Sequence, residues 1–226
     1  ACQKQPKAVL NRVALSLLAS VGGHRKDLTA GHVESLLALR HMEVGKTLSG
    51  ELYDNVGENI WIAKSAVVAP SATIIGPCII GERTEVRVSA FIRGCVIVGC
   101  DSVIGNSCEL KNCIIFDNVQ VPHFNYVGDS VLGYRSHMGA GAVTSNVKSD
   151  KTNVCVKYEN EQIETGFKKF GAMLGDFVEV GCNSVLNPGT IIGRNTNIYP
   201  LSSVRGVIPS NSIFKRADQV ILKIKK

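Results

Sequence analysis

One short stretch of the chain holds residue types that could carry acid–base chemistry. His123 stands in "VPHFNYVGDS", residues 121–130, close to Asn125, Tyr126 and Asp129, whose side chains can all form hydrogen bonds. A histidine titrates near neutral pH, so an imidazole outside the packed interior is suited to act as a general base. The alternative is an ordinary histidine on a surface loop, and the residue types alone leave both interpretations open.

Two basic residues upstream are spaced for binding an anion. Arg93 and Lys111 lie 18 residues apart, which is one coil of the repeat described next, so both should lie on the same face. Neighbouring strands are about 5 Å apart, and two cations at that separation repel each other unless an anion lies between them. A sugar phosphate would fit there, and two solvated surface charges are the alternative.

The scaffold that must position these residues is a six-residue repeat. Large apolar residues recur at every sixth position, namely Ile62, Val68, Ile74, Ile80, Val86, Ile92, Val98, Ile104, Leu110 and Phe116. A period of six is neither the 3.6 of a helix nor the 2 of a flat strand. It is typical of a hexapeptide β-helix, in which three short strands close one triangular coil. The predicted fold class is therefore all-β, with Ile62, Ile80, Val98 and Phe116 in one interior stack.

The same repeat assigns places to glycine and cysteine. Gly81, Gly99 and Gly105 should occupy corners, where glycine permits backbone conformations that other residues resist. Cys78 and Cys108 fall at the small inward positions. The remaining repeat cysteines fall at other phases, where exposure is expected: Cys95, Cys100 and Cys113. His123 lies where the sixfold phase breaks, and we interpret this break as moving it off the packed prism.

The repeat divides the chain into three parts. Residues 1–58 form an N-terminal helical segment and linker, because "KAVLNRVALSLLASV" and "TAGHVESLLALRHMEV" carry apolar residues at helical spacing. Their apolar faces should pack on the solenoid or on another subunit. Residues 59–208 form the β-helix, interrupted near 146–170 by a polar insertion that must leave the prism as a loop or arm. Residues 209–226 form a basic tail.

Composition and charge exclude several function classes. The net charge is +6, but no long run of Lys and Arg occurs, so no nucleic-acid partner is expected. No apolar run approaches the roughly 18 residues of a membrane helix, and no signal peptide is evident, so we expect a cytoplasmic protein without a membrane partner. The eight cysteines include no C-x-x-C pair. His123 and His137 lack a third ligand in the repeat, so no metal site is predicted.

Five segments of the repeat together resemble a known family. They are "FIRG", "IGNSCELKN", "VPHFNYVGDSVLG", "MGAGAVTSN" and the long "GFKKFGAMLGDFVEVGCNSVLNPGTIIGRNTNIYP". The chain resembles the acetyltransferase domain of the bifunctional N-acetylglucosamine-1-phosphate uridyltransferase/glucosamine-1-phosphate acetyltransferase, and also sugar-1-phosphate nucleotidyltransferases with a β-helix tail. The resemblance covers about two thirds of the chain and implies a homotrimer of left-handed parallel β-helices.

The resemblance also implies an activity and a set of site residues. The activity is acetyl-CoA-dependent N-acetylation of a hexosamine 1-phosphate, with no metal required and with glucosamine or galactosamine as the sugar. His123 would be the catalytic base. Sugar-phosphate contacts would come from Arg93, Lys111, Tyr126, Asn146 and, from a neighbouring subunit, Lys169. Acetyl-CoA contacts would come from Gly139, Ala140, Cys182 and Pro200.

The chain departs from the family at two positions and in one domain. His137 stands where the uridyltransferases have asparagine, and Cys182 stands where they have serine near the CoA arm. The relatives' Rossmann-like nucleotidyltransferase domain has no counterpart here, so nucleotide transfer is not expected. The alternative function is therefore a non-catalytic or regulatory β-helix related to the UDP-N-acetylglucosamine pyrophosphorylases. A nucleotide-linked amino sugar as acceptor is a third, weaker interpretation.

Overall fold

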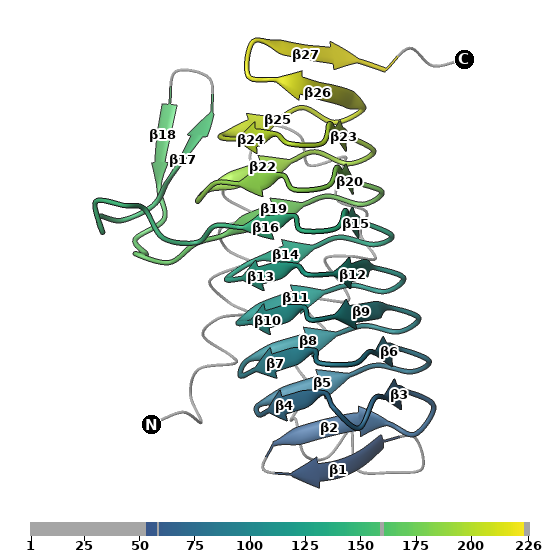
Figure 1. Cartoon of the computed structure of the whole chain (residues 1–226). Helices are drawn as coiled ribbons and strands as arrows, with labels where there is room; N and C mark the ends of the chain where they lie inside the picture. The colour runs from purple at the N-terminus through teal and green to yellow at the C-terminus, as the bar shows by residue number, and fades with distance from the viewer. Residues whose placement is uncertain (1–52, 58, 159–160, 224–226) are drawn as a thin grey trace.

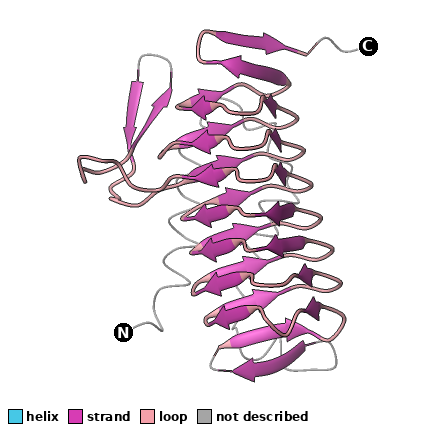
Figure 2. Cartoon of the chain, viewed as in Figure 1, coloured by secondary structure: helices cyan, strands magenta, loops and turns pink. Residues whose placement is uncertain are grey.

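Stacked β-strands make up every regular element in the described part of the chain. The structure, a computed structural model, describes residues 53–57, 59–158 and 161–223 (Figure 1). Figure 2 shows strands joined by short loops along the whole column. The two helices that the sequence predicts within residues 7–44 lie outside the described residues. The predicted fold class, an all-β left-handed parallel β-helix, is confirmed.

Three sheets form the faces of a triangular prism, which we name faces A, B and C. Face A contains, in spatial order, β1 (Tyr53–Gly57), β2 (Ile60–Ala63), β5 (Cys78–Ile80), β8 (Val96–Val98), β11 (Cys113–Ile115), β14 (Val131–Leu132), β19 (Ala172–Leu174), β22 (Thr190–Ile192) and β25 (Val207–Ile208). Face B contains β3 (Val67–Val68), β6 (Glu85–Val86), β9 (Val103–Asn106), β12 (Gln120–His123), β15 (His137–Met138), β20 (Glu179–Val180), β23 (Asn197–Ile198), β26 (Ser212–Arg216) and β27 (Gln219–Leu222). Face C contains β4 (Thr73–Ile75), β7 (Phe91–Arg93), β10 (Glu109–Lys111), β13 (Tyr126–Gly128), β16 (Val143–Thr144), β21 (Val185–Leu186) and β24 (Ser203–Val204).

Aliphatic side chains at the repeat positions fill the prism. Ile80, Ile92 and Ile104 are fully buried, and they come from faces A, C and B respectively. Parallel pairing places equivalent residues of successive coils directly over one another, so each face contributes one continuous interior stack. The only antiparallel pairings within the three faces lie at the two ends, where β1 pairs with β2 and β26 with β27.

The interior stack of face A differs from the prediction by one residue. Ile80 pairs with Val98, 18 residues on, but Val98 pairs with Ile115, only 17 residues on. Ile115 is therefore the buried residue, and Phe116, predicted to continue the stack, is only partly buried. A second five-residue step separates Val127 from Leu132, both fully buried. The step from Val121 to Val127 keeps its six residues, so the prediction that the phase breaks at His123 is wrong.

The same slip corrects one cysteine. Cys78 and Cys108 are buried as predicted, but Cys113 is also buried, at 2% exposure, because the shortened coil moves it into the small inward position. Cys95 and Cys100 are half-buried.

The corner glycines serve a different purpose from the one predicted. Gly105 does not adopt a positive φ; instead a Cβ there would collide with the Pro122 backbone of the next coil. The left-handed corner position is held mostly by other residues, such as Asn118 and Asn183, because asparagine tolerates this conformation.

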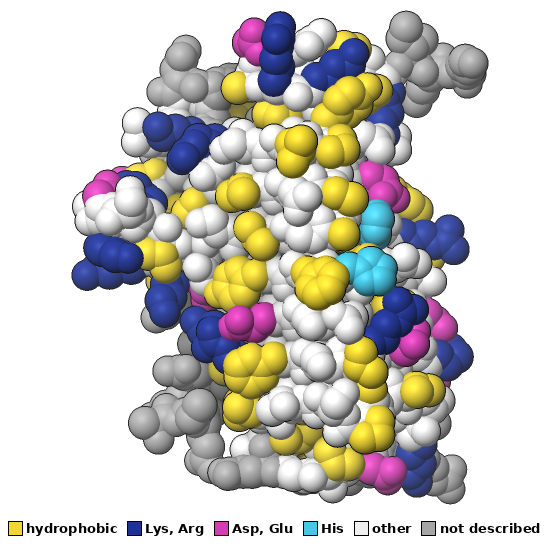
Figure 3. Space-filling view, in the orientation of Figure 1, with side chains coloured by type: hydrophobic (Ala, Val, Ile, Leu, Met, Phe, Trp, Pro, Cys, Tyr) yellow, Lys and Arg dark blue, Asp and Glu magenta, His cyan; other side chains and the backbone are white. Residues whose placement is uncertain are grey.

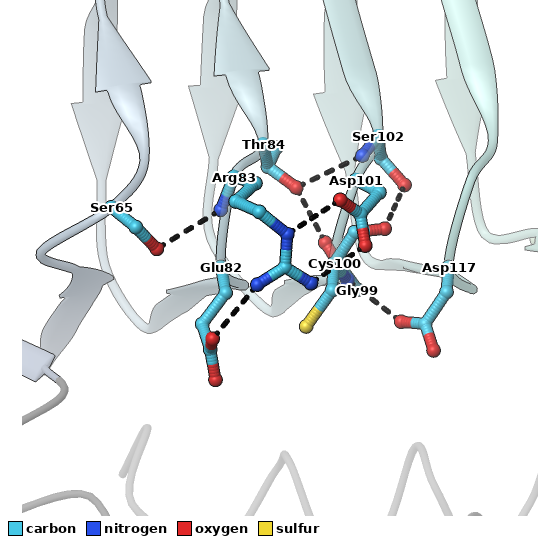
Figure 4. A network of polar contacts seen from close by, with 9 residues as sticks. All are labelled: Ser65, Glu82, Arg83, Thr84, Gly99, Cys100, Asp101, Ser102 and Asp117. Carbon is cyan, nitrogen blue, oxygen red and sulfur yellow. Dashed lines mark hydrogen bonds and ion pairs between the residues drawn. The ribbon is translucent and has the colours of Figure 1, made fainter.

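Polar side chains fasten the corner between faces A and B in the early coils (Figure 4). The guanidinium of Arg83 donates to both carboxylate oxygens of Asp101 on the next coil, over 2.7 and 2.8 Å. Behind this exposed pair, the buried hydroxyl of Thr84 donates to the carbonyl of Gly99 over 2.6 Å. The amide of Ser102 in turn donates to the Thr84 hydroxyl over 3.1 Å. This ladder fixes the register of successive coils.

An arm leaves the prism after face C and returns to face A. It carries the hairpin of β17 (Cys155–Tyr158) and β18 (Glu161–Glu164), which stands beside the later coils (Figure 1). Its buried apolar residues, Val154, Val156 and Phe170, pack on the outer side of face A. Strands Ser212–Arg216 and Gln219–Leu222 close the C-terminal end.

Candidate functional site

His123 lies at the corner between faces B and C, with its side chain exposed. It ends β12, and the next residue, Phe124, takes the left-handed conformation that turns the chain into face C. The side chain of Asn125, only 3% exposed, points into the prism and fixes this corner. Its Oδ1 accepts a hydrogen bond from the His123 amide over 3.0 Å. Its Nδ2 donates to the carbonyls of Gly139 and Ala142 on the following coil, over 2.8 and 3.0 Å.

Three of the four predicted acetyl-CoA contacts line up with His123 along this corner. The amide of Gly141 donates to the His123 carbonyl over 3.0 Å, which places Ala140 in the next coil beside His123. The Asn183 amide donates to the Ala140 carbonyl over 2.8 Å, and so on through Cys182 to the turn that holds Pro200. His123, Ala140, Cys182 and Pro200 thus form one column, which we name the corner column. Cys182 is exposed and free.

Gly139 has a different environment from the corner column. Its amide donates to the carbonyl of Val180 over 2.7 Å. A Cβ at this position would lie 2.6 Å from both the Val180 carbonyl oxygen and the Cys182 amide nitrogen. Gly139 therefore allows two coils to pack closely, and this buried position does not face the solvent as a ligand contact would.

The predicted sugar-phosphate residues gather on face C and its corner with face A. Phe91, Glu109 and Tyr126 are successive partners across β7, β10 and β13, so the residues that follow them stack as well. Arg93 lies one coil before Lys111, as predicted. The expectation that two cations on one face need an anion is met in part by the protein, because Glu109 accepts a hydrogen bond from Arg93 over 2.5 Å.

Lys111 is surrounded by both signs of charge. The pKa of Lys111 is lowered from its ordinary value, chiefly by burial. The positive charges of Lys169 and Arg93 lower it further, while the carboxylate of Asp129 opposes them. An ammonium that is partly desolvated and flanked by two other cations gains from a bound anion.

Tyr126 is held in place by the coil that follows it. Its phenol oxygen accepts a hydrogen bond from Nδ2 of Asn146 over 3.1 Å, and the same nitrogen donates to Asp129. Asp129 also accepts from the side chain of Asn112. Burial raises the pKa of the Tyr126 phenol, so the hydroxyl stays protonated at neutral pH and can donate to a ligand.

The arm delivers Lys169 to this group. It leaves the prism after Asn146 and returns beside it, where Val147 bridges to Lys169 and the Phe170 amide donates to the Asn146 carbonyl over 2.9 Å. The family resemblance implies that Lys169 acts from a neighbouring subunit. In the structure Lys169 lies within electrostatic reach of Lys111 of its own chain.

Two residues of this group, Glu109 and Asp129, were not predicted as site residues. Glu109 occupies the outward position between Phe91 and Tyr126, so the 18-residue stacking rule that selected Arg93 and Lys111 could have found it. Asp129 belongs to the stretch around His123, but its position became clear only with the path of Asn146. We name Arg93, Glu109, Lys111, Tyr126, Asp129, Asn146 and Lys169 the charged group.

The corner column and the charged group border the same short strand. Strand β13 runs between them and spans three residues, about 10 Å of extended chain. Figure 3 shows Lys/Arg and Asp/Glu side chains close together on one side of this surface and histidine side chains on the other. An elongated small molecule could contact both.

His137 lies on β15, the strand that pairs with β12, and is half-exposed. Its Nδ1 is 2.8 Å from a carboxylate oxygen of Glu179 on the next coil. No group of three or more His, Cys, Asp and Glu side chains suited to a metal ion occurs among the residues that the structure describes. Within the same ranges, no helix has the length and apolarity needed to span a bilayer.

Known proteins resemble this chain in sequence and in fold. A family model described as "GMPPB C-terminal domain" matches residues 74–167. The bifunctional protein GlmU of Methanococcus aeolicus is 30% identical over 188 residues, which cover 80% of this chain and 45% of the relative. The GlmU of Methanococcus maripaludis is 30% identical over 211 residues, covering 91% of this chain and 51% of the relative.

Two further proteins match smaller shares or only the fold. A bifunctional sugar-1-phosphate nucleotidylyltransferase/acetyltransferase of Sulfurisphaera tokodaii is 33% identical over 127 residues, covering 56% of this chain and 32% of that protein. The solved structure of a hexapeptide transferase family protein from Anaplasma phagocytophilum covers 73% of this chain and 79% of its own, at 15% identity and a TM-score of 0.48.

The chain spans about half the length of the first two curated relatives. The matching region takes in both the corner column and the charged group of this chain. With the three-faced prism and the hexapeptide repeat, these matches identify the described part of this chain as a GlmU-like left-handed β-helix domain.

Proposed function

We propose that this chain is an acetyl-CoA-dependent N-acetyltransferase acting on a hexosamine 1-phosphate, with glucosamine 1-phosphate and galactosamine 1-phosphate as the candidate acceptors. The observation that carries the proposal is the convergence of three cations, Arg93, Lys111 and Lys169, one short strand away from the exposed His123. The name of the Sulfurisphaera tokodaii relative, which includes both sugar-1-phosphate and acetyltransferase, supports the same class.

The charged group is suited to a phosphate. Glu109 neutralises part of Arg93, and Asp129 opposes the other cations at Lys111, so the resting protein tolerates the cluster. A dianionic phosphate would add two negative charges beside three positive ones and relieve their mutual repulsion. Tyr126, fixed by Asn146, presents a protonated hydroxyl beside the same place.

His123 is proposed as the general base. A sugar ammonium must lose a proton before its nitrogen can attack, and an exposed imidazole can accept it. The nitrogen then forms a bond to the acetyl carbonyl carbon, the carbon–sulfur bond of the thioester breaks, and CoA leaves as a thiolate that takes up a proton. Asn125 holds the His123 backbone, so the imidazole starts from a fixed corner.

The corner column is proposed as the path of acetyl-CoA. Ala140, Cys182 and Pro200 follow His123 along one corner, so a linear molecule lying there would bring its thioester end to the imidazole. We further propose a homotrimer, because Phe124 and Leu201 on this corner are 64% and 79% exposed, which suits a contact with a neighbouring subunit. No metal is assigned a role in this chemistry.

Release of the CoA thiol tests the proposal. The chain is mixed with acetyl-CoA and, separately, glucosamine 1-phosphate, galactosamine 1-phosphate or a nucleotide-linked amino sugar. Release with a hexosamine 1-phosphate supports the proposal, and release with the nucleotide-linked sugar alone would change the acceptor class. No release with any of them, at millimolar substrate, would favour the non-catalytic β-helix.

A further inference from the structure

The outward side of face A is apolar along its whole length. The middle residues of its strands pair in one continuous ladder: Trp61, Ile79, Ile97, Ile114, Val131, Met173, Ile191 and Val207. We name this the outer ladder. A strand exposed on one side alternates apolar residues with polar ones that face water, so eight consecutive apolar residues indicate a face that is covered.

Face B provides the contrast within the same molecule. Its corresponding outward positions are Val67, Glu85, Val103, Gln120, His137, Glu179, Asn197 and Ile213. Most of them are polar, as expected for a surface in water. The apolar character of the outer ladder is therefore a property of face A and not of the repeat.

The later part of the outer ladder is already covered by the chain itself. Ile114, Val131 and Met173 are no more than 4% exposed, because the arm residues Val154, Val156 and Phe170 pack against them. Ile191 and Val207 contact the same cluster. The early part consists of Trp61, Ile79 and Ile97. These three residues belong to neither of the apolar clusters that the described residues form.

We propose that the N-terminal segment, residues 1–52, covers the early part of the outer ladder, as the arm covers the later part. The described chain begins at Tyr53 in β1, which pairs with β2 on this same face, so the preceding residues enter beside Trp61. The proposal concerns an interaction within the domain and does not depend on the proposed acetyltransferase activity.

The dimensions of the segment match the surface it would cover. Trp61 and Ile97 are two coil steps apart, about 10 Å. The helix that the sequence predicts over residues 29–44 would be about 24 Å long, enough to cross all three residues. Its apolar side, including Val33, Leu36 and Leu37, offers the side chains that the ladder lacks.

Trp61 makes the proposal measurable, because it is the one tryptophan in the sequence. Its fluorescence is recorded in the full chain, together with its quenching by acrylamide. Leu36→Asp should shift the emission to longer wavelength and raise the quenching constant several-fold. The matched control is Ser35→Asp, which adds the same charge on the opposite side of the predicted helix and should leave both quantities unchanged.

A second pair of variants tests the ladder from the other side. Ile97→Asp on face A should make residues 1–52 several-fold more sensitive to trypsin, whereas Val103→Asp at the equivalent position of face B should not. Equal quenching of Trp61 in the wild type and Leu36→Asp, or equal cleavage of the two ladder variants, would overturn the proposal. A drop in oligomer mass that accompanies the change in quenching would also overturn it, in favour of a second copy as the occupant.

Discussion

The phenol oxygen of Tyr126 accepts a hydrogen bond of 3.1 Å from the side-chain amide of Asn146, which lies one coil further along the prism. The same amide nitrogen donates to Asp129 at the next corner. Asn146 is also the last residue before the arm departs, and its carbonyl accepts the Phe170 amide where the arm returns. One residue therefore connects the phenol, the carboxylate and the segment that carries Lys169.

Replacement of Asn146 should affect both stability and sugar binding. Asn146→Ala removes two side-chain hydrogen bonds, so the free energy of unfolding in urea should fall by about 1–2 kcal/mol. If the proposed function holds, the KM for the hexosamine 1-phosphate should rise far more than the KM for acetyl-CoA, because Tyr126 loses its partner. Asn153→Ala, on the exposed arm, is the control. A proportional rise in both KM values would contradict this account of the site.

Gly128 should be required for the position of the tyrosine ring. A Cβ at Gly128 would collide with Oη of Tyr126, and it would lie 2.7 Å from Cζ of the same ring and 2.9 Å from Nδ2 of Asn146. Gly128→Ala should therefore displace the ring and raise the KM for the sugar phosphate, while circular dichroism still reports a folded β-helix. Gly57→Ala, whose Cβ would come no closer than 3.1 Å to Ile60, should have no such effect. An unchanged KM in Gly128→Ala would show that the ring does not contact the acceptor.

Acetyl-CoA should protect Cys182 from alkylation. Cys182 is exposed and belongs to the corner column, so a bound CoA would cover its sulfur. Labelling by iodoacetamide, followed by peptide mass spectrometry, should slow at Cys182 in the presence of acetyl-CoA. Cys155 on the arm, which lies away from the column, should label at the same rate with and without it. Equal labelling of Cys182 under both conditions would place the cofactor elsewhere.

Phosphate binding should draw a proton onto Lys111 at alkaline pH. The pKa of Lys111 lies below its ordinary value of 10.5, so part of the free protein lacks this proton at a pH between the two. A bound phosphate favours the ammonium and raises the pKa, so protons are taken up in that window and none well below it. Calorimetry with glucose 1-phosphate, which has no amine, in buffers of different ionisation enthalpy counts them.

Two variants separate Lys111 from its neighbours in that experiment. Lys111→Met should abolish the uptake, whereas Lys168→Met, which removes an exposed charge beside Lys169, should retain it. Persistence of the full uptake in Lys111→Met would assign the proton to another group.

Much of the fold follows from the sequence because the interior has a strict period. Residues such as Ile80 and Ile92 recur every six positions, and no helix or flat sheet has this spacing. The one-residue slips could not be located in the same way, since Ile115 and Phe116 are both large and apolar and either could fill the stack. Only the pairing of Ile115 with Val98 decides between them.

The site was predictable where it depends on stacking and unpredictable where it depends on the arm. Arg93 and Lys111 follow from the 18-residue rule. The position of Lys169 does not, because a 42-residue coil separates the pairing partners Val131 and Met173 and its path is set by packing on face A. The pairing of Arg93 with Glu109 was missed for a related reason: a spacing of 16 residues falls outside the repeat.

The central claim is that His123 accepts the proton when a hexosamine 1-phosphate is acetylated. The most direct measurement is the initial rate of CoA release from acetyl-CoA and glucosamine 1-phosphate by the wild type, His123→Ala and the control Gln120→Ala. Loss of a general base should lower the rate of His123→Ala by about 100-fold or more, with an unchanged melting temperature because the side chain is exposed. Gln120→Ala should keep the wild-type rate, and a His123→Ala rate equal to that of the wild type would contradict the account.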